Sequence, residues 1–209
     1  MSIKDTFKNL LWGQLGRPSG LNGRIVGRLM TASNIPAHDL TLSNVRLEPG
    51  DRVLEVGFGG GALIEKLLDT SPGVTVCGID ASGVMVRQAR ARNLDAVRRK
   101  DAELLLGDVS SLPYSDASFE KVVSVHSIYF WPDPISNLRE ISRVLVPGGY
   151  FVLTIDYTEP MKDPTAGEIG HTTWSRAALL TVLAEAGFSD VGSEVREDSL
   201  VCAWGGKPV

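Results

Sequence analysis

Short apolar runs alternate with segments of helical periodicity along the chain from Arg52 onward. The apolar runs predict strands at Arg52–Val56, Val74–Asp80, Ala102–Leu106, Lys121–Val125 and Tyr150–Asp156. The segments between them predict helices at Ala62–Thr70, Ser82–Asn93 and Pro134–Leu145. Strands that are apolar throughout and separated by helices indicate a parallel sheet that is covered on both faces.

The pattern changes near the C-terminus. A predicted helix at Ser175–Ala186, closed by Gly187, precedes two short predicted strands at Ser189–Val195 and Ser199–Trp204. Only "REDS" joins these strands, and so short a connection suits antiparallel neighbours. We therefore expect an α/β fold: a doubly wound, mostly parallel seven-stranded sheet with a C-terminal antiparallel hairpin and helices on both faces.

Residues 1–48 are expected to form an N-terminal helical extension, and residues 49–209 a single domain. Glycines recur at short intervals in the extension, at Gly16, Gly20, Gly23 and Gly27. Because glycines weaken a continuous helix, we expect a turn near Gly16–Gly20, a helix near Leu21–Asn34 and a second helix from about Ala37. "EPGD" then predicts a turn before the first strand.

The composition is that of a globular protein, with 43% hydrophobic and 22% charged residues. A net charge of −4 argues against a dedicated nucleic-acid binder, because such proteins usually carry a basic excess. Cys77 and Cys202 lie in apolar runs without a His or Cys at metal-binding spacing, which predicts core thiols in a reducing compartment. Neither a signal-peptide pattern nor an apolar run of membrane-spanning length is seen, so we expect a cytoplasmic protein.

The stretch "RVLEVGFGGGALIEKL" leaves a buried strand, turns on glycines and enters a helix. Glycine allows the backbone to approach a ligand closely, and the amides at the start of the helix favour an anionic or polar group. Gly57, Gly59 and Ala62 satisfy the dinucleotide-binding spacing in its G/A variant, so an NAD-dependent oxidoreductase is one alternative. The lysine and Ser/Thr of a phosphate-binding P-loop are absent.

Three carboxylates at predicted strand ends favour a different cofactor. Glu55, inside the glycine motif, suits a cofactor with a cationic end better than a pyrophosphate. Asp80, at the end of the second strand, can accept from both ribose hydroxyls, and Asp108 follows the third strand, where an adenine amino group would lie.

At these motifs the chain resembles the class I, Rossmann-like S-adenosylmethionine-dependent methyltransferases. The matching stretches are "VLEVGFGGG", "GIDAS", "GDVSSLPYSDASFEKVVSV" and "LREISRVLVPGGYFVLT". Within that superfamily it is most similar to small-molecule methyltransferases related to ubiquinone/menaquinone-biosynthesis enzymes. The resemblance implies that residues 49–209 form the methyltransferase domain.

The resemblance also assigns roles around S-adenosylmethionine. It implies that the glycines contact the methionine portion and the sugar, and that Glu55 helps to fix the ammonium. Asp80 would bind the ribose, while Ala81, Met85, Asp108 and the amide of Val109 would surround the adenine. His126 would line the methionine end. The implied cofactor-binding set is Glu55, Gly57, Phe58, Gly59, Gly61, Asp80, Ala81, Met85, Asp108, Val109 and His126.

The acceptor side is less defined by the sequence. Tyr129 and Trp131, after the fourth strand, are candidates for the acceptor pocket wall, and His171 for an acceptor-side base. Residues near Leu11–Met30 are a candidate lid, with Trp12 and Arg17 reaching the site.

Transfer from a sulfonium needs alignment more than a side-chain catalyst, so no catalytic residue is named. We expect metal-independent in-line displacement onto a small organic acceptor, with S-adenosylhomocysteine as product. No nucleic-acid or membrane partner is expected, and the chain is expected to be a monomer or homodimer. A module that binds S-adenosylmethionine without catalysis is the second alternative.

Overall fold

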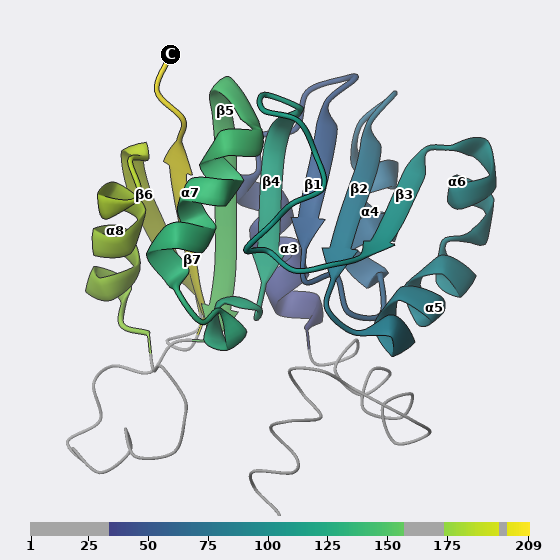
Figure 1. Ribbon diagram of the computed structural model, residues 1–209, viewed down its shortest axis with the longest axis horizontal. Coiled ribbons are helices and arrows are strands. Elements are labelled where there is room, and N and C mark those ends of the chain that lie inside the picture. Colours follow the sequence, from purple (N-terminus) through teal and green to yellow (C-terminus); the bar gives the residue numbers. More distant parts are fainter. Residues whose placement is uncertain (1–33, 157–173, 197–199) are drawn as a thin grey trace, which may run out of the picture.

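The computed structural model describes residues 34–156, 174–196 and 200–209, which form a sheet with helices on both faces (Figure 1). The predicted turn near Gly16–Gly20 and most of the helix near Leu21–Asn34 lie outside these residues. So do Trp12, Arg17 and His171, the candidates for a lid and an acceptor-side base.

Seven strands form one sheet in the order β3-β2-β1-β4-β5-β7-β6. They are β1 (Arg52–Val56), β2 (Thr75–Asp80), β3 (Ala102–Leu106), β4 (Phe119–Val125), β5 (Leu145–Asp156), β6 (Ser189–Arg196) and β7 (Leu200–Gly206). Neighbouring strands from β3 to β5 are parallel, and β7 runs antiparallel to both β5 and β6. The predicted mostly parallel sheet with a C-terminal antiparallel hairpin is confirmed.

The helices also follow the predicted order. They are α3 (Ile35–Asn44), α4 (Ala62–Thr70), α5 (Gly83–Arg92), α6 (Leu94–Arg99), α7 (Pro134–Val144) and α8 (Arg176–Glu185), with a short 3₁₀ turn, η1 (Ile128–Phe130). Ser82 caps α5 by accepting from the amide of Met85, and Pro134 opens α7, as predicted.

Most boundaries agree with the sequence prediction to within one or two residues, and two differences are larger. The structure adds α6, because the buried side chain of Asn93 ends α5 by bonding the carbonyls of Ala89 and Gly61, and a new helix starts at once. Strand β5 begins at Leu145 rather than at Tyr150, because the "VPGG" segment continues the pairing with β4 through a register shift.

Side chains alternate between two apolar layers across the sheet. Leu54, Val122 and Phe151 face the layer under α7 and α8, whereas Val53, Val123 and Val152 face the layer under α3, α4 and α5. Cys77 and Cys202 are buried as free thiols, one on each side of the sheet, as predicted.

The position of the site follows from the strand order. After β1 the chain forms β2 on one side of β1, and it later returns to place β4 on the other side. Ligands of doubly wound sheets bind at the carboxyl ends of the strands where the order reverses in this way. In Figure 1 this edge is the lower one, toward which the arrowheads of β1, β2 and β3 point.

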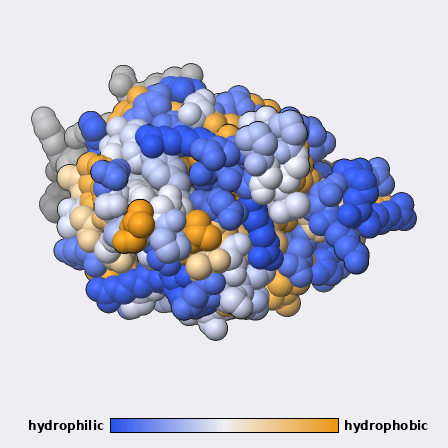
Figure 2. All heavy atoms as spheres, turned by 90° about the horizontal axis from the view of Figure 1, so that it is seen from above, coloured by the Kyte–Doolittle hydropathy of each residue, from blue (hydrophilic) through white to orange (hydrophobic). Residues whose placement is uncertain are grey.

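The edge at the amino ends of the parallel strands has the surface of a solvated region. Seen from the amino ends of the parallel strands, the surface is mostly hydrophilic and its hydrophobic atoms are scattered (Figure 2). The protruding hydrophilic end is that of α5 and α6, whose arginines pair with acidic neighbours, Arg92 with Glu65 and Arg98 with Asp95. Such pairing indicates a solvated helix surface.

Candidate functional site

The loop between β1 and α4 is built on three glycines in the left-handed region, with φ of 77° at Gly57, 51° at Gly59 and 75° at Gly61. Side chains other than glycine are strained there, which explains the glycine motif. Gly61 is also the N-cap of α4 and supplies no side-chain cap. The N-cap residue thus supplies no side-chain acceptor to the first amides of α4.

The three glycines have different neighbours. A Cβ on Gly57 would lie 2.6 Å from Cβ of Ser127, and one on Gly61 would lie 2.7 Å from Cβ of Ala89. A Cβ on Gly59 would meet nothing within 4 Å among the described residues. Gly57 and Gly61 thus allow close packing against the β4 loop and α5, while Gly59 is the glycine whose missing side chain faces free space.

Asp80, the last residue of β2, holds this loop in place. Its Oδ2 accepts from the amide of Gly59 at 2.8 Å, and its Oδ1 accepts from the amide of Ser82 at 2.8 Å. Burial raises the pKa of Asp80 to about 6, against the lowering effect of these two amides. Each carboxylate oxygen keeps a further lone pair, so ribose hydroxyls could still donate to it.

Glu55 is an unusual residue for the interior of a central strand. Its side chain is 2% exposed, and its Oε2 has no hydrogen-bond partner among the described residues. Burial, and next the charge of Asp80, raise the pKa of Glu55 well above its ordinary value. A buried carboxyl oxygen without a partner is costly, so this position points to a group that the protein itself does not supply.

These features fit the cofactor that the sequence resemblance implies. An ammonium group would satisfy Glu55 and lower its pKa, and a ribose would find acceptors on Asp80. Gly59 leaves space beside Asp80 for the backbone to approach the ligand. The buried, unpaired oxygen of Glu55 is the observation in this structure that favours a ligand with a cationic end.

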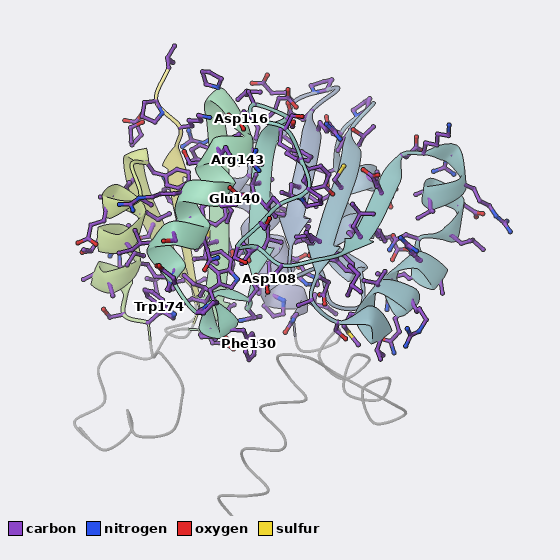
Figure 3. All side chains as sticks on the ribbon, in the orientation of Figure 1. Asp108, Asp116, Phe130, Glu140, Arg143 and Trp174 are labelled. Carbon is purple, nitrogen blue, oxygen red and sulfur yellow. The ribbon has the colours of Figure 1, made fainter. Side chains whose placement is uncertain are left out.

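The remaining adenine-side candidates lie around the ends of β2 and β3. Asp108 is half-buried, and its Oδ1 accepts from the amide of Ser110 at 3.0 Å. In Figure 3 it lies toward the carboxyl edge, below Glu140 and Arg143. Ala81 is exposed, whereas Met85 and Val109 are buried.

Phe58 faces the core. Its side chain is 4% exposed and lies in the layer under α3, α4 and α5. A Cβ on Gly78 would lie 2.6 Å from its ring, so Gly78 makes room for it in β2. Only the backbone of Phe58 remains as a plausible contact for a ligand at the loop.

The end of β4 closes the other side of the glycine loop. Ser124 Oγ donates to the carbonyl of Val56 at 3.0 Å and also bonds Ser127 Oγ, which links β4 to the end of β1. His126, between these serines, has a φ of 52°, an uncommon backbone conformation for a non-glycine residue. This conformation places its imidazole beside Asp156 at the end of β5.

The hydrogen bonding of His126 indicates its protonation state. The amide of Asp156 donates to its Nδ1 at 3.3 Å, so a neutral imidazole carries its proton on Nε2. Burial lowers the pKa of His126, while the carboxylate of Asp156 raises it. His126 therefore can present an N–H donor at the carboxyl edge.

The aromatic residues after β4 divide into buried and exposed ones. Trp131 is 8% exposed and belongs to the core under α7 and α8. Tyr129 stacks on His126 with ring centres 6.4 Å apart, and its hydroxyl donates to the carbonyl of Asp156 at 2.6 Å. Phe130, with 39% exposure, is the member of this group most accessible from outside (Figure 3).

Sequence reasoning missed three residues that the structure makes notable for their exposure or for an unpartnered polar atom. Phe130 stands between the two aromatic residues chosen as candidates, and its exposure depends on the η1 turn, which the sequence pattern did not predict. Trp174 is 5% exposed, with no partner for its Nε1 among the described residues. His38, on α3, is also buried, and its Nδ1 has no partner among the described residues. Nothing in the sequence singles it out except that the chain has only three histidines.

Within the described residues, no group of three or more His, Cys, Asp or Glu side chains is arranged to hold a metal ion. In the same part of the chain, no helix has the length and apolar character needed to span a membrane.

Comparison with protein families matches residues 54–153 to a family described as a methyltransferase domain. The chain is 29% identical to the uncharacterized methyltransferase YdaC of Bacillus subtilis, over 88% of this chain and 98% of YdaC. It is 31% identical to 24-methylenesterol C-methyltransferase 2 of Oryza sativa, over 71% of this chain and 42% of that protein. A fatty-acid O-methyltransferase of Mycolicibacterium smegmatis is 37% identical, over 50% of this chain and 37% of that protein. The chain thus spans less than half of the latter two relatives.

The chain is also similar in fold to solved structures of methyltransferases. A chain of the Haloferax volcanii complex between the Trm112 methyltransferase activator and a methyltransferase matches with a TM-score of 0.73 and 25% identity. The match covers 88% of this chain and 94% of that chain. A SAM-dependent methyltransferase from Aquifex aeolicus matches with a TM-score of 0.69 and 20% identity, over 87% of this chain and 98% of that chain, and supports the fold.

Proposed function

Because the chain belongs to the class I, Rossmann-like S-adenosylmethionine-dependent methyltransferases, we propose that it methylates a small organic acceptor by metal-independent in-line displacement. The finer relation to ubiquinone/menaquinone-biosynthesis enzymes stays a prediction. The observation that carries the proposal is the buried carboxyl oxygen of Glu55, which has no hydrogen-bond partner in the described part of the chain and lies near the charge of Asp80, where the strand order reverses.

The residues of this chain would bind and orient the reactants. When bound, S-adenosylmethionine supplies an electrophilic methyl group on a sulfonium with a good leaving group. Glu55 would fix the ammonium, Asp80 the ribose and Asp108 the adenine, across the ends of three adjacent strands. Such fixation aligns the methyl group with an acceptor held on the β4 side. In well-oriented intramolecular reactions, alignment lowers the activation free energy by up to about 7–11 kcal/mol.

A small, partly apolar acceptor is supported by the edge of the site near β4. His126 and Tyr129 form a stacked pair there, and Phe130 is exposed next to them. The names of two relatives, a sterol and a fatty-acid methyltransferase, describe acceptors of this chemical kind for those proteins. Tyr129 is unsuited to act as a general base, because burial raises the pKa of its hydroxyl and so keeps the phenol protonated at neutral pH.

The experiment is calorimetry with S-adenosylhomocysteine and NAD at neutral pH, in buffers that differ in ionisation enthalpy. We expect S-adenosylhomocysteine to bind and to release a proton, because its ammonium lowers the raised pKa of Glu55. Glu55→Gln should abolish the proton release and weaken binding about tenfold to a hundredfold, as for a buried charge-assisted hydrogen bond. Glu65→Gln, at an exposed glutamate on α4, is the matched control.

NAD binding without S-adenosylhomocysteine binding would instead support an oxidoreductase. If S-adenosylhomocysteine binds but no metabolite extract accepts a labelled methyl group from S-adenosylmethionine, the chain is a non-catalytic binding module. Sedimentation analysis tests the proposed monomer or homodimer. If the chain is stable or active only with an added protein, such as the activator in the Haloferax complex, the proposed monomer or homodimer is wrong.

A further inference from the structure

His38 is a buried residue of α3, the helix that packs over β4, β5 and β7. Thr41, one turn later on the same face of α3, donates to Oγ1 of Thr154 at 2.7 Å. Thr154 is close to the C-terminal end of β5, and its carbonyl accepts from the amide of His126 at 2.9 Å. Because α3 runs against the direction of β1, a step back from Thr41 to His38 leads about 4.5 Å further toward the edge where His126 lies.

The surroundings of His38 leave one of its polar atoms unsatisfied. The residue is 6% exposed, and its Nδ1 is buried without a hydrogen-bond partner among the described residues. Such a nitrogen in a closed environment needs a donor or an acceptor from elsewhere.

Glu55 projects from the same face of the sheet. Residues paired across parallel strands share a face, and the pairs Glu55 with Val123 and Val125 with Thr154 connect β1, β4 and β5. Thr154 contacts α3, so Glu55 also points to the α3 side. Glu55 Oε2 and His38 Nδ1, both without a partner in the described ranges, therefore lie on the same side of the sheet.

The strand order indicates which end of the cofactor lies near His38. Asp80 ends β2 and Asp108 follows β3, on one side of β1, whereas α3 packs over β4, β5 and β7, on the other side. A cofactor with its nucleoside across β2 and β3 has its amino-acid end at β1 and β4.

We propose that His38 is a positioning residue for the amino-acid end of S-adenosylmethionine, accepting at Nδ1 a hydrogen bond from the ammonium that Glu55 holds. This inference rests on the proposed function. An ammonium has three N–H donors, and burying it requires several acceptors. A neutral imidazole provides one without adding a second negative charge beside Glu55.

The electrostatic setting of His38 agrees with an acceptor role. Burial lowers its pKa to about 4, and the charges of Lys66, His126 and Arg92 act in the same direction against that of Asp39. Its lone pair therefore stays available at neutral pH.

The test uses two ligands, S-adenosylhomocysteine and 5′-methylthioadenosine, which lacks the amino-acid end. His38→Phe should lower the affinity for S-adenosylhomocysteine about tenfold and change that for methylthioadenosine less than about twofold. His38→Asn should restore much of the loss, because its side-chain oxygen takes the place of Nδ1. Asp39→Asn, at a partly exposed neighbour on α3, is the control.

A spectroscopic readout on the wild-type protein makes the test independent of how well the variants fold. With ¹⁵N-labelled histidine, the Nδ1 signal of His38 should move on adding S-adenosylhomocysteine and stay in place with methylthioadenosine. If S-adenosylhomocysteine binds while the His38 signal and the His38→Phe affinity are unchanged, the role of His38 is refuted and the proposed function stands. If neither ligand binds, both proposals fail.

Discussion

At the scale of single residues, Asp80 connects pH to cofactor binding. Burial raises its pKa from 3.8 to about 6, so its carboxylate is ionised above that pH and protonated below it. Ribose hydroxyls donate to the ionised form. Methylthioadenosine, which has no ammonium to interact with Glu55, should therefore bind about tenfold more weakly at about pH 5 than at about pH 7.5.

Asp80→Asn provides the comparison for this prediction. The amide cannot titrate, so the affinity of this variant for methylthioadenosine should be low and nearly independent of pH in titration calorimetry. A wild-type affinity that does not change over the same range would mean that Asp80 does not contact the ribose.

Gly59 permits a matched test of the glycine loop. Gly59 and Gly50 both have positive φ, and a Cβ on either would meet no atom of the described residues within 4 Å. Alanine should cost about 1–2 kcal/mol of unfolding free energy at each position, from backbone strain alone. Only Gly59→Ala should also weaken S-adenosylhomocysteine binding, because the amide of Gly59 donates to Asp80 and its missing side chain faces the site. Equal affinities of the two variants in calorimetry would contradict this.

At the scale of elements, Arg143 fastens the β3–β4 connection to α7. Its guanidinium donates to Asp116 at 2.7 Å, to Glu140 at 2.8 Å and to the carbonyl of Tyr114 at 2.8 Å, and Glu140 accepts from the amide of Leu112 at 2.8 Å. Figure 3 shows these side chains in a row between the connection and α7. The connection begins at Asp108, so this network supports one end of the proposed adenine site.

The same network makes stability sensitive to acid. Bonding to Arg143 lowers the pKa of Glu140 below its ordinary value of 4.5. A lowered carboxyl pKa contributes stability above the unfolded-state pKa, and this contribution is lost as the pH falls below about 4.5. In urea denaturation, the wild type should lose up to about 1 kcal/mol more than Glu140→Gln between about pH 6 and pH 3.5. An equal loss of unfolding free energy in both proteins would show that Glu140 does not cause the acid sensitivity.

At the scale of the whole molecule, the two thiols report on global unfolding. Cys77 is 4% exposed and Cys202 is fully buried, in separate layers of the core, and burial raises the pKa of each thiol. Both should react with a thiol reagent only after unfolding. S-adenosylhomocysteine at about 100 times its Kd should slow the reaction about a hundredfold, because it binds only the folded state. NAD at the same concentration should have no effect.

Much of the architecture could be read from local patterns. The strands β1 and β3 and the helix α4 have the bounds that the apolar runs and helical spacing predicted. The turn after β1 requires glycine for its positive φ, and the short connection before β7 allows only antiparallel strands. Both features depend on neighbouring residues in the chain, so the sequence predicts them directly. The helix α6 gave no such signal, because its boundary depends on Asn93 contacting Gly61 from another element.

Some features of the candidate site could likewise be predicted from the sequence, and others could not. The sequence by itself determined the succession of strands and of every helix from α4 onward except α6, and it determined the glycine turn. It also determined the three carboxylates at the carboxyl ends of β1, β2 and β3, because parallel strands bring these ends to one edge. Only the tertiary structure decided that Glu55 Oε2 and His38 Nδ1 are buried without a partner among the described residues, and that Phe130 rather than Trp131 is exposed. These properties arise from contacts between segments distant in the chain, and the spacing of residues along one segment contains no record of them.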